Sequence, residues 1–415
     1  MRNQFLIWGL FSLFLLAIVP LSIKLLLSLS WLENSFSVYT ILIQIAIAIV
    51  FALSYNMLLG QGGMLSFGHA VYFGLGGFLT VHLLNYVEYY EWWLPLVTVP
   101  LFGGLFGLLA GIFVGSFSTR KAGTVFAMIS LGIGELIFAC STIFVSFFGG
   151  EGGISADRTM GPVIFDVDFA QDVEVYFLAA GWVIIATYLM YLFTRTPAGR
   201  IANAVRDNPE RAEFLGYSAR KVRFISFCFS GFFAGIAGGL YAINYEIVTE
   251  VNVNAATSGS VLLMAYIGGL GFFIGPIIGA VIFTLFNNLL VNYTELHYLY
   301  IGIMFVLTVM FLPRGFAGLI MMHQVPFRRK TIKSLIAPYF ITGVPALLFS
   351  IAIIGIIELW HSEADVFNYL GIGFNPSAFW SWSMLIGLAA VGLFFTKLSL
   401  NQLTRAWDNA IGSNT

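Results

Sequence analysis

Long apolar stretches, separated by short polar segments, run through almost the whole chain. A helix needs about 20 apolar residues to cross the hydrocarbon core of a bilayer. Stretches of this kind predict twelve spans, at about 5–30, 38–59, 64–85, 94–117, 123–148, 174–194, 223–244, 258–271, 272–291, 298–320, 335–358 and 378–397. The pair at 258–291 is short and rich in glycine, so it is either two spans or a re-entrant segment. The pattern predicts an all-α polytopic membrane protein.

Basic residues fall almost entirely on one side of these spans. With the N-terminus inside, seventeen of the nineteen Lys and Arg residues lie in cytoplasmic segments, as the positive-inside rule expects. The two exceptions are Lys24 and Arg158. The longest polar segment, residues 195–223, carries seven of the basic residues and is called the polar loop below. The N-terminus and the polar loop are therefore predicted to be cytoplasmic.

The polar loop contains signals that start and stop a short helix. Asn208 can cap a helix whose first residue is Pro209, a position where the missing N–H of proline costs nothing. Glu210 then lies in the first turn, where the helix dipole favours an anion. Gly216 can end the helix in a left-handed turn after Leu215. The resulting surface helix is either a docking element or part of a solvated loop that only fixes topology.

Composition agrees with a membrane protein and limits the other classes. Of 415 residues, 59% are hydrophobic and 9% are charged, whereas soluble domains average about 45–50% apolar and about 25% charged residues. A net charge of −1 provides no bulk field for nucleic acid. Cys140 and Cys228 both lie inside apolar runs, where they are expected to act as packing residues and not as a disulfide or metal site.

Two glycine-rich stretches, residues 59–77 and 268–279, predict interruptions of helices within the membrane. Small residues also allow close helix packing, but these glycines are clustered more densely than packing alone requires. Irregular backbone at membrane depth is tolerated where it is buried in protein or lines a cavity, and transporters bind substrates at such breaks. Candidate residues of a translocation pathway are Asn56, Ser66, His69, Glu135, Gly268, Gly269 and Gly271.

Two of these candidates have alternative interpretations. Glu135 lies in the middle of a predicted span with no basic residue expected beside it, and an isolated charge there is costly. It is either a pathway group or a protonated group that forms a hydrogen bond between helices. His69 follows a predicted break, so it either bonds backbone carbonyls freed by the break or lines the pathway.

Motifs for nucleotide, metal or redox chemistry are missing from the sequence. It has no G-x-x-x-x-G-K-[ST] phosphate loop, no HExxH and no C-x-x-C. We therefore expect a chain that is not an enzyme and has no cofactor of its own. If ATP drives transport, another chain must bind and hydrolyse it.

Six separated segments resemble one family, the membrane permease subunits of high-affinity branched-chain amino acid ABC importers. The resemblance covers about residues 35–320 and fits the longer of the two permeases in such systems. The segments are SYNMLLGQGGMLSFGHAVYFGLGG (54–77), ISLGIGEL (129–136), GGEGGI (149–154), TPAGRIANAVRDNPERAEFLGYSARKVRF (196–224), SGFFAGIAGGLYA (230–242) and LLMAYIGGLGFFIGPIIGA (262–280).

The resemblance implies a multi-pass protein of the bacterial inner membrane that works in a complex. Its partners would be a second permease subunit, two ATPase subunits that bind ATP, and a periplasmic substrate-binding protein, together with membrane lipid. Residues 1–324 would form the permease domain of about ten spans, and residues 325–415 would be a C-terminal extension with two more. The complex would import branched-chain amino acids or related small polar solutes. Relatives also carry urea, amides and aromatic acids, and the binding protein chooses the substrate.

The polar loop is similar to the coupling motif E-A-A-x-x-x-G of these importers. The resemblance implies that an ATPase-coupling loop is formed by Asn208, Pro209, Glu210, Arg211, Ala212, Glu213, Leu215 and Gly216. Arg211 departs from the motif's second position. The alternative function is a secondary transporter coupled to H⁺ or Na⁺ through Glu135, which would leave the capped helix without a purpose.

Overall fold

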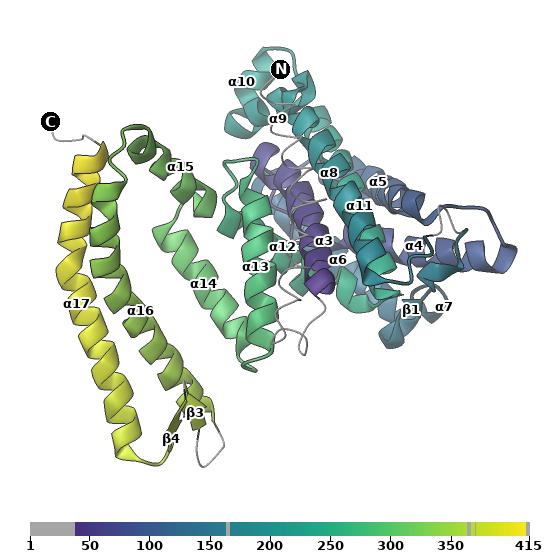
Figure 1. Cartoon of the computed structure of the whole chain (residues 1–415). Coiled ribbons are helices and arrows are strands. Elements are labelled where there is room, and N and C mark those ends of the chain that lie inside the picture. Colours follow the sequence, from purple (N-terminus) through teal and green to yellow (C-terminus); the bar gives the residue numbers. More distant parts are fainter. Residues whose placement is uncertain (1–37, 163–166, 363–366, 370, 412–415) are drawn as a thin grey trace. The chain divides into compact units, whose positions relative to one another are not determined.

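The computed structural model describes residues 38–162, 167–362, 367–369 and 371–411, and they are predominantly helical (Figure 1). The helices, in chain order, are α3 (Val38–Asn56), η2 (Met57–Gln61), α4 (Ala70–Tyr90), η3 (Leu96–Thr98), α5 (Val99–Ser118), α6 (Gly123–Ile143), α7 (Val145–Phe148), η4 (Gly150–Gly152), η5 (Arg158–Met160), α8 (Asp172–Arg195), α9 (Pro197–Asp207), α10 (Pro209–Phe214), α11 (Ala219–Tyr245), η6 (Glu250–Val253), α12 (Ala255–Gly268), α13 (Gly275–Val291), α14 (His297–Phe311), α15 (Gly315–Arg328), α16 (Lys333–His361) and α17 (Phe379–Ile411). The strands are β1 (Ile154–Ser155), β2 (Ile247–Val248), β3 (Phe367–Tyr369) and β4 (Ile372–Phe374).

Eight helices in the described ranges are long and apolar enough to cross a membrane, or nine if α14 and α15 form one bent span. The chain is therefore an all-α polytopic membrane protein, as predicted. The predicted pair at 258–291 corresponds to α12 and α13, two apolar helices that are shorter than a full span. The predicted span at 5–30 lies outside the described residues.

Several predicted helix bounds differ from the structure; the span predicted at 378–397, for example, continues to Ile411. The span predicted from residue 64 begins only at Ala70, because the glycine-rich segment before it is irregular. The span predicted at 298–320 is bent by 44° between α14 and α15. Pro313 has no N–H to continue the helical ladder, and Gly315 has a positive φ of 63°. The surface helix α10 ends at Phe214, one residue earlier than predicted.

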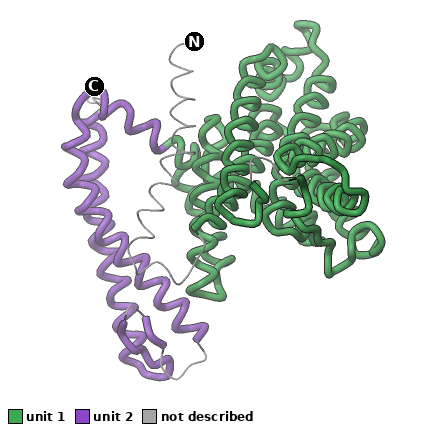
Figure 2. Tube along the Cα trace, turned by 45° about the vertical axis from the view of Figure 1, so that its right-hand side comes forward, with its two compact units in different colours: residues 1–318 green, residues 319–415 purple. Residues whose placement is uncertain are grey.

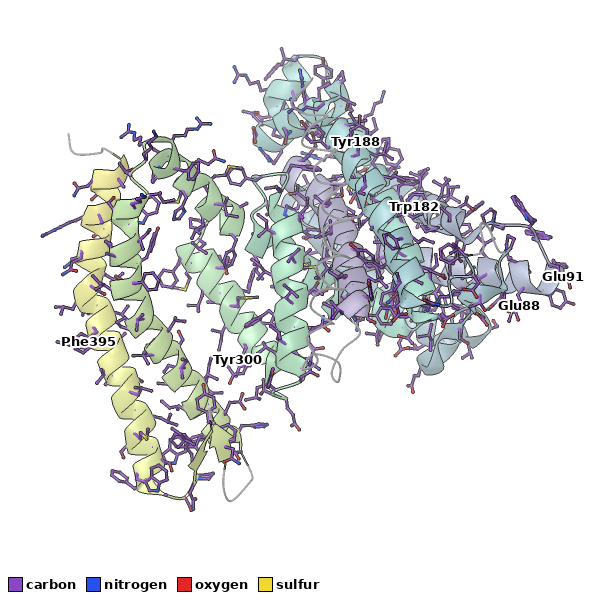
Figure 3. All side chains as sticks on the ribbon, in the orientation of Figure 1. Glu88, Glu91, Trp182, Tyr188, Tyr300 and Phe395 are labelled. Carbon is purple, nitrogen blue, oxygen red and sulfur yellow. The ribbon has the colours of Figure 1, made fainter. Side chains whose placement is uncertain are left out.

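The chain divides into two compact units, Met1–Gly318 (unit 1) and Leu319–Thr415 (unit 2), shown in green and purple in Figure 2. The boundary falls inside α15. In unit 2, α16 and α17 run antiparallel to each other and are joined through the β3–β4 hairpin (Figure 1). Much of their apolar surface is exposed in this chain, and Phe395 of α17 is one such residue (Figure 3).

Helix α11 forms the centre of unit 1, with 72% of its apolar stretch buried. It packs against α3, α4 and α5, and glycines bring the backbones of α4, α5 and α11 into direct contact. A β-carbon on Gly76 would lie 2.6 Å from the Cα of Gly235, and one on Gly107 would overlap the carbonyl oxygen of Gly231. We call this interface the glycine seam. Such close approach is typical of small residues between membrane helices.

A polar cluster around Arg158 joins the ends of three elements of unit 1. The Arg158 guanidinium donates to the carbonyls of Phe169, Ala170 and Asn244 and pairs with Asp172 at 3.3 Å. The same region holds the short antiparallel pair β1–β2. One of the two exceptions in the basic-residue pattern therefore has a structural explanation, since Arg158 satisfies backbone carbonyls.

The exposed Glu88 and Glu91 lie at the end of α4 (Figure 3).

Candidate functional site

The first predicted helix break is present between α3 and α4. Helix α3 continues into the π-helical turn η2, and an irregular segment then leads to α4. Three hydrogen bonds hold this segment. The Tyr55 hydroxyl donates to the carbonyl of Ser66 at 3.0 Å. The N–H groups of Phe67 and Ala70 donate to the hydroxyls of Ser130 (3.0 Å) and Ser258 (2.9 Å), which lie on α6 and α12. Neighbouring helices thus satisfy backbone groups that the break leaves free.

The second predicted break lies between α12 and α13, and it meets the first. A β-carbon on Gly60 would lie 3.0 Å from the carbonyl oxygen of Leu270, a tight contact, so the missing side chain of Gly60 helps the two segments to approach each other. Gly268 packs against the backbone of Gly275, whereas nothing lies within 4 Å of a β-carbon position on Gly271. Gly269 has a φ of 105° and packs against the backbone of residues 314–315. The predicted pathway glycines therefore gather at one junction.

Buried polar atoms are concentrated at the first break. The side-chain atoms Asn56 Oδ1, Gln61 Oε1, Ser66 Oγ and His69 Nδ1 have no hydrogen-bond partner among the described residues. A buried polar group without a partner typically costs about 1–3 kcal/mol. Bound water or a polar solute that forms hydrogen bonds with these groups would therefore stabilise the first break.

His69 itself is fully buried in the core of unit 1. Its Nε2 forms a hydrogen bond of 2.9 Å with the hydroxyl of Ser54, and its ring stacks on Phe51 with centroids 5.5 Å apart. His69 therefore bonds a side-chain hydroxyl, and among the described residues it makes no hydrogen bond to a backbone carbonyl, which was one of the two alternatives. That His69 lines the pathway stays a prediction. Tight aromatic packing fixes its orientation.

Glu135 lies on the exposed face of α6, halfway along this apolar helix. It makes no hydrogen bond or ion pair within the part of the chain that the structure describes, so no described residue supplies the predicted helix-to-helix hydrogen bond. The opposite face of α6 packs through Ser130 and Gly134 against the first break at Gly68. A carboxylate facing acyl chains is costly, so this face requires protein or water beside it in the membrane.

The polar loop folds into a hairpin of two short helices, α9 and α10. Asn208 caps α10 as predicted, since its side-chain oxygen accepts from the N–H of Arg211 at 2.9 Å. Gly216 has a φ of 87°, as predicted for the left-handed turn. Buried Ala212 packs with Val205 of α9 and Ala219 of α11, so α10 is attached to unit 1 by a small apolar cluster.

The other side of α10 is exposed. Phe214 and Leu215 are 90% and 72% exposed, and Glu210, Arg211 and Glu213 are exposed beside them. Arg211, the residue that departs from the coupling motif, therefore lies at a position that packing within this chain does not constrain. Exposed apolar side chains rimmed by charges are typical of a surface that binds another protein.

Arg206 connects this hairpin to the first break. Its guanidinium donates to the carbonyl of Gly60 in η2 and also pairs with Asp207 at 2.9 Å. Its Cγ lies 2.7 Å from the β-carbon position of Gly63, so a side chain on Gly63 would collide with Arg206. Sequence analysis missed this contact, because Arg206 was one of seven basic residues in the polar loop and nothing local distinguished it.

A cavity of about 280 Å³ lies between helices of unit 1 and is lined by many amide and hydroxyl groups. The Asn288 amide donates to the side-chain oxygen of Gln44 at 2.8 Å and joins α13 to α3. The polar residues lining the cavity are Gln44, Tyr241, Tyr245, Asn252, Thr257, Ser260, Thr284, Asn287 and Asn288. These residues lie on α3, α11, α12, α13 and η6, which are far apart in the sequence, so the sequence alone could not predict that they line one cavity. Among the described residues no group of three or more His, Cys, Asp or Glu could hold a metal ion.

Broken apolar helices, unpaired polar groups at the break and a surface hairpin attached to it are features found in membrane transport proteins. The chain belongs to the family described as branched-chain amino acid transport system, permease component, whose model matches residues 37–309. It is thus a branched-chain amino acid ABC permease by family.

Individual relatives of the chain are also named as permease proteins of transport systems. The high-affinity branched-chain amino acid transport system permease protein LivM of Escherichia coli strain K12 is 26% identical over 292 residues, which cover 65% of this chain and 67% of that protein. The guanosine ABC transporter permease protein NupQ of Bacillus subtilis strain 168 is 25% identical and covers 36% of this chain and 48% of its own length. The autoinducer 2 import system permease protein LsrC of Escherichia coli strain K12 is 28% identical over 27% of this chain and 35% of its own. No solved structure matches the chain significantly.

Proposed function

We propose that this chain is the permease subunit of an ATP-driven importer in a bacterial inner membrane. It would translocate branched-chain amino acids or related small polar solutes delivered by a periplasmic binding protein. The observation that carries the proposal is the contact of Arg206 with Gly60, because it joins a surface hairpin to a helix break inside the membrane. Since the sequence has no phosphate loop, partner ATPase subunits bind and hydrolyse ATP.

The ATPase subunits dock on the exposed side of α10. Phe214 and Leu215 provide apolar contact area there, and Glu210, Arg211 and Glu213 provide the charged rim. Because α10 is flanked by spans α8 and α11, a displacement of the hairpin reaches the membrane domain. Arg206 transmits this displacement to η2, and the polar residues Asn56, Ser66 and His69 at the first break line the pathway in the open state.

The second permease subunit covers the exposed face of α6. Glu135 lies on that face, and lipid is a poor environment for its carboxylate. Pairing of two permeases along α6 would put Glu135 at the interface, on the face of α6 opposite to the first break. The junction of the two breaks, which contains Gly268, Gly269 and Gly271, would belong to the same pathway. A wet interface between subunits accommodates a charged or polar group and a polar solute alike.

The substrate range follows from the relatives. Their names include branched-chain amino acids, guanosine and autoinducer 2, so one permease architecture serves solutes of different size and polarity. We assign branched-chain amino acids to this chain because its family carries that name, as does a relative that matches over 292 residues.

A secondary transporter coupled to H⁺ or Na⁺ is the second candidate, and exposed Glu135 is the observation that favours it. That function requires no ATPase and leaves the exposed apolar side of α10 without a partner. Uptake of labelled leucine by cells depleted of ATP, with the ion gradient maintained, separates the two. Uptake that persists would favour the secondary transporter.

The test of the proposed function is the double substitution Glu210→Lys with Gly216→Val in the complete transport complex. We expect the ATPase subunits to dissociate, or to hydrolyse ATP without import of labelled leucine. If ATPase binding and import are both unchanged, the hairpin is only a topological linker and the proposal loses its support.

A further inference from the structure

A cavity of about 470 Å³ opens between the end of α5 and the start of α11 in unit 1. Three of its lining residues are cations, Arg120, Arg220 and Lys221. Ser116 and Ser218 contribute hydroxyl groups, and Phe224 forms an apolar wall. None of the mechanism proposed above uses this cavity.

No described carboxylate balances the charges in the cavity. None of its lining residues is Asp or Glu, and within the described ranges neither Arg120 nor Arg220 nor Lys221 pairs with a carboxylate. Arg120 is oriented by its Nε, which donates to the backbone carbonyl of Ser116 at 3.2 Å. Like charges held in one pocket repel each other, so a bound anion is stabilised there.

The first turn of α11 adds to the positive potential. This helix has 27 residues, and Ser218 caps it by accepting from the N–H of Lys221 at 3.5 Å. The remaining N–H groups of the first turn and the helix dipole favour an anion at this end. Hydroxyls, cations and helix N–H groups together are the donors that a phosphate group requires.

The cavity also lies at the end of an exposed apolar stripe on α5. Leu109, Phe113 and Phe117 of α5 are 61%, 73% and 42% exposed. Their helical spacing continues to Ser116 and Arg120, so the apolar stripe leads directly to the basic cavity. A phosphate on glycerol with acyl chains attached matches both parts at once, whereas a free phosphate matches only the cavity.

We propose that this cavity binds the phosphate group of an anionic phospholipid. By the positive-inside pattern the lipid belongs to the cytoplasmic leaflet, where clusters of basic residues between spans attract anionic headgroups. The acyl chains lie along the exposed stripe of α5, and Phe224 packs against the glycerol end. Inorganic phosphate shares the headgroup chemistry and is the competing ligand to be separated by experiment.

The test is a titration of the purified full-length chain with phosphatidylglycerol, followed by native mass spectrometry. Each basic residue beside the bound anionic headgroup contributes about a fivefold change in lipid affinity. The variant Arg220→Gln with Lys221→Gln should therefore bind phosphatidylglycerol roughly 30-fold more weakly. The matched control is Arg195→Gln with Arg200→Gln, which removes two charges from the same loop outside the cavity and should leave affinity unchanged.

Several results would overturn the proposal. One is equal binding of phosphatidylglycerol and phosphatidylcholine, and another is equal loss in the two double variants. Inorganic phosphate that binds alone and displaces the lipid at equal concentration would assign the cavity to free phosphate. A cavity variant that keeps lipid but loses the ATPase subunits would assign these cations to the protein interface. If the double variant is not monodisperse, Arg120→Gln alone tests the opposite wall, with an expected loss of about fivefold.

Discussion

The link between the surface hairpin and the helix break leads to a quantitative prediction for Arg206. Substitution of Arg206 by Met retains the methylene groups that pack at Gly63 and removes the guanidinium that bonds the Gly60 carbonyl. Hydrogen bonds that involve a charged group contribute about 1.5–3 kcal/mol. The Arg206 side chain is 37% exposed, so solvent screening favours the lower end of that range.

The second interaction of Arg206 adds little to this value. The side chain of Asp207 is 67% exposed, and an exposed ion pair of this kind contributes about 0–1 kcal/mol. We therefore expect Arg206→Met to weaken the coupling between the surface hairpin and η2 by about 1.5–2 kcal/mol. This corresponds to roughly a 10- to 30-fold change in the equilibrium constant that couples their movements. Loss of coupling of this size lowers import per ATP hydrolysed and leaves ATPase docking intact.

The assay is uptake of labelled leucine and ATP hydrolysis by the same reconstituted complex. Arg206→Met should reduce uptake by about tenfold at similar ATPase content, in line with the coupling energy. The control is Arg200→Met, an exposed position on the same helix. Wild-type uptake in Arg206→Met, or an equal decrease in both variants, would refute the role of the Gly60 contact.

Three further predictions follow from the site and the loops around it. Glu135→Gln should impair uptake while the complex still assembles; normal kinetics would exclude Glu135 from the pathway. Single cysteines at exposed Glu151 and Glu213 should be labelled from opposite sides of the membrane, and labelling from one side contradicts the topology. Hydrogen bonds from the hydroxyl and N–H of Thr159 lower the pKa of Asp157, so the stability that they provide is present at neutral pH and is lost as pH falls through that lowered pKa. Exchange protection of the amides around η5, corrected for intrinsic rates, should therefore decrease only below about pH 4, and a decrease between pH 5 and 7 would contradict this assignment.

Features with a local cause could be predicted from the sequence. The spans follow from apolar length, and helix α10 follows from the cap at Asn208 and the turn at Gly216. Glycine density predicted both helix breaks, although it placed the start of α4 too early. In each case the determining residues lie within a few positions of one another.

Features that depend on distant residues could not be predicted. Arg206 and Gly60 are 146 positions apart, and the hydrogen bond from the Asn288 amide to the side-chain oxygen of Gln44 joins residues 244 positions apart. The contact of Gly60 with Leu270 likewise depends on how helices pack, which hydropathy does not encode. His69 illustrates the same limit, because its partner Ser54 is determined by the way α4 returns onto α3 after the break.

The glycine seam determines which parts of unit 1 can change shape during a transport cycle. Where backbones touch directly, no layer of side chains remains between α4, α5 and α11 that could switch rotamers and let one helix slide past another. We therefore expect these three helices to move as a single rigid block. Opening and closing are then expected in elements outside the block. These are η2 at the first break, α6, of whose apolar stretch only 22% is buried, and the short helices α12 and α13 on either side of the second break. In this view α4, α5 and α11 stay fixed relative to one another during transport, and the chain bends at its two helix breaks.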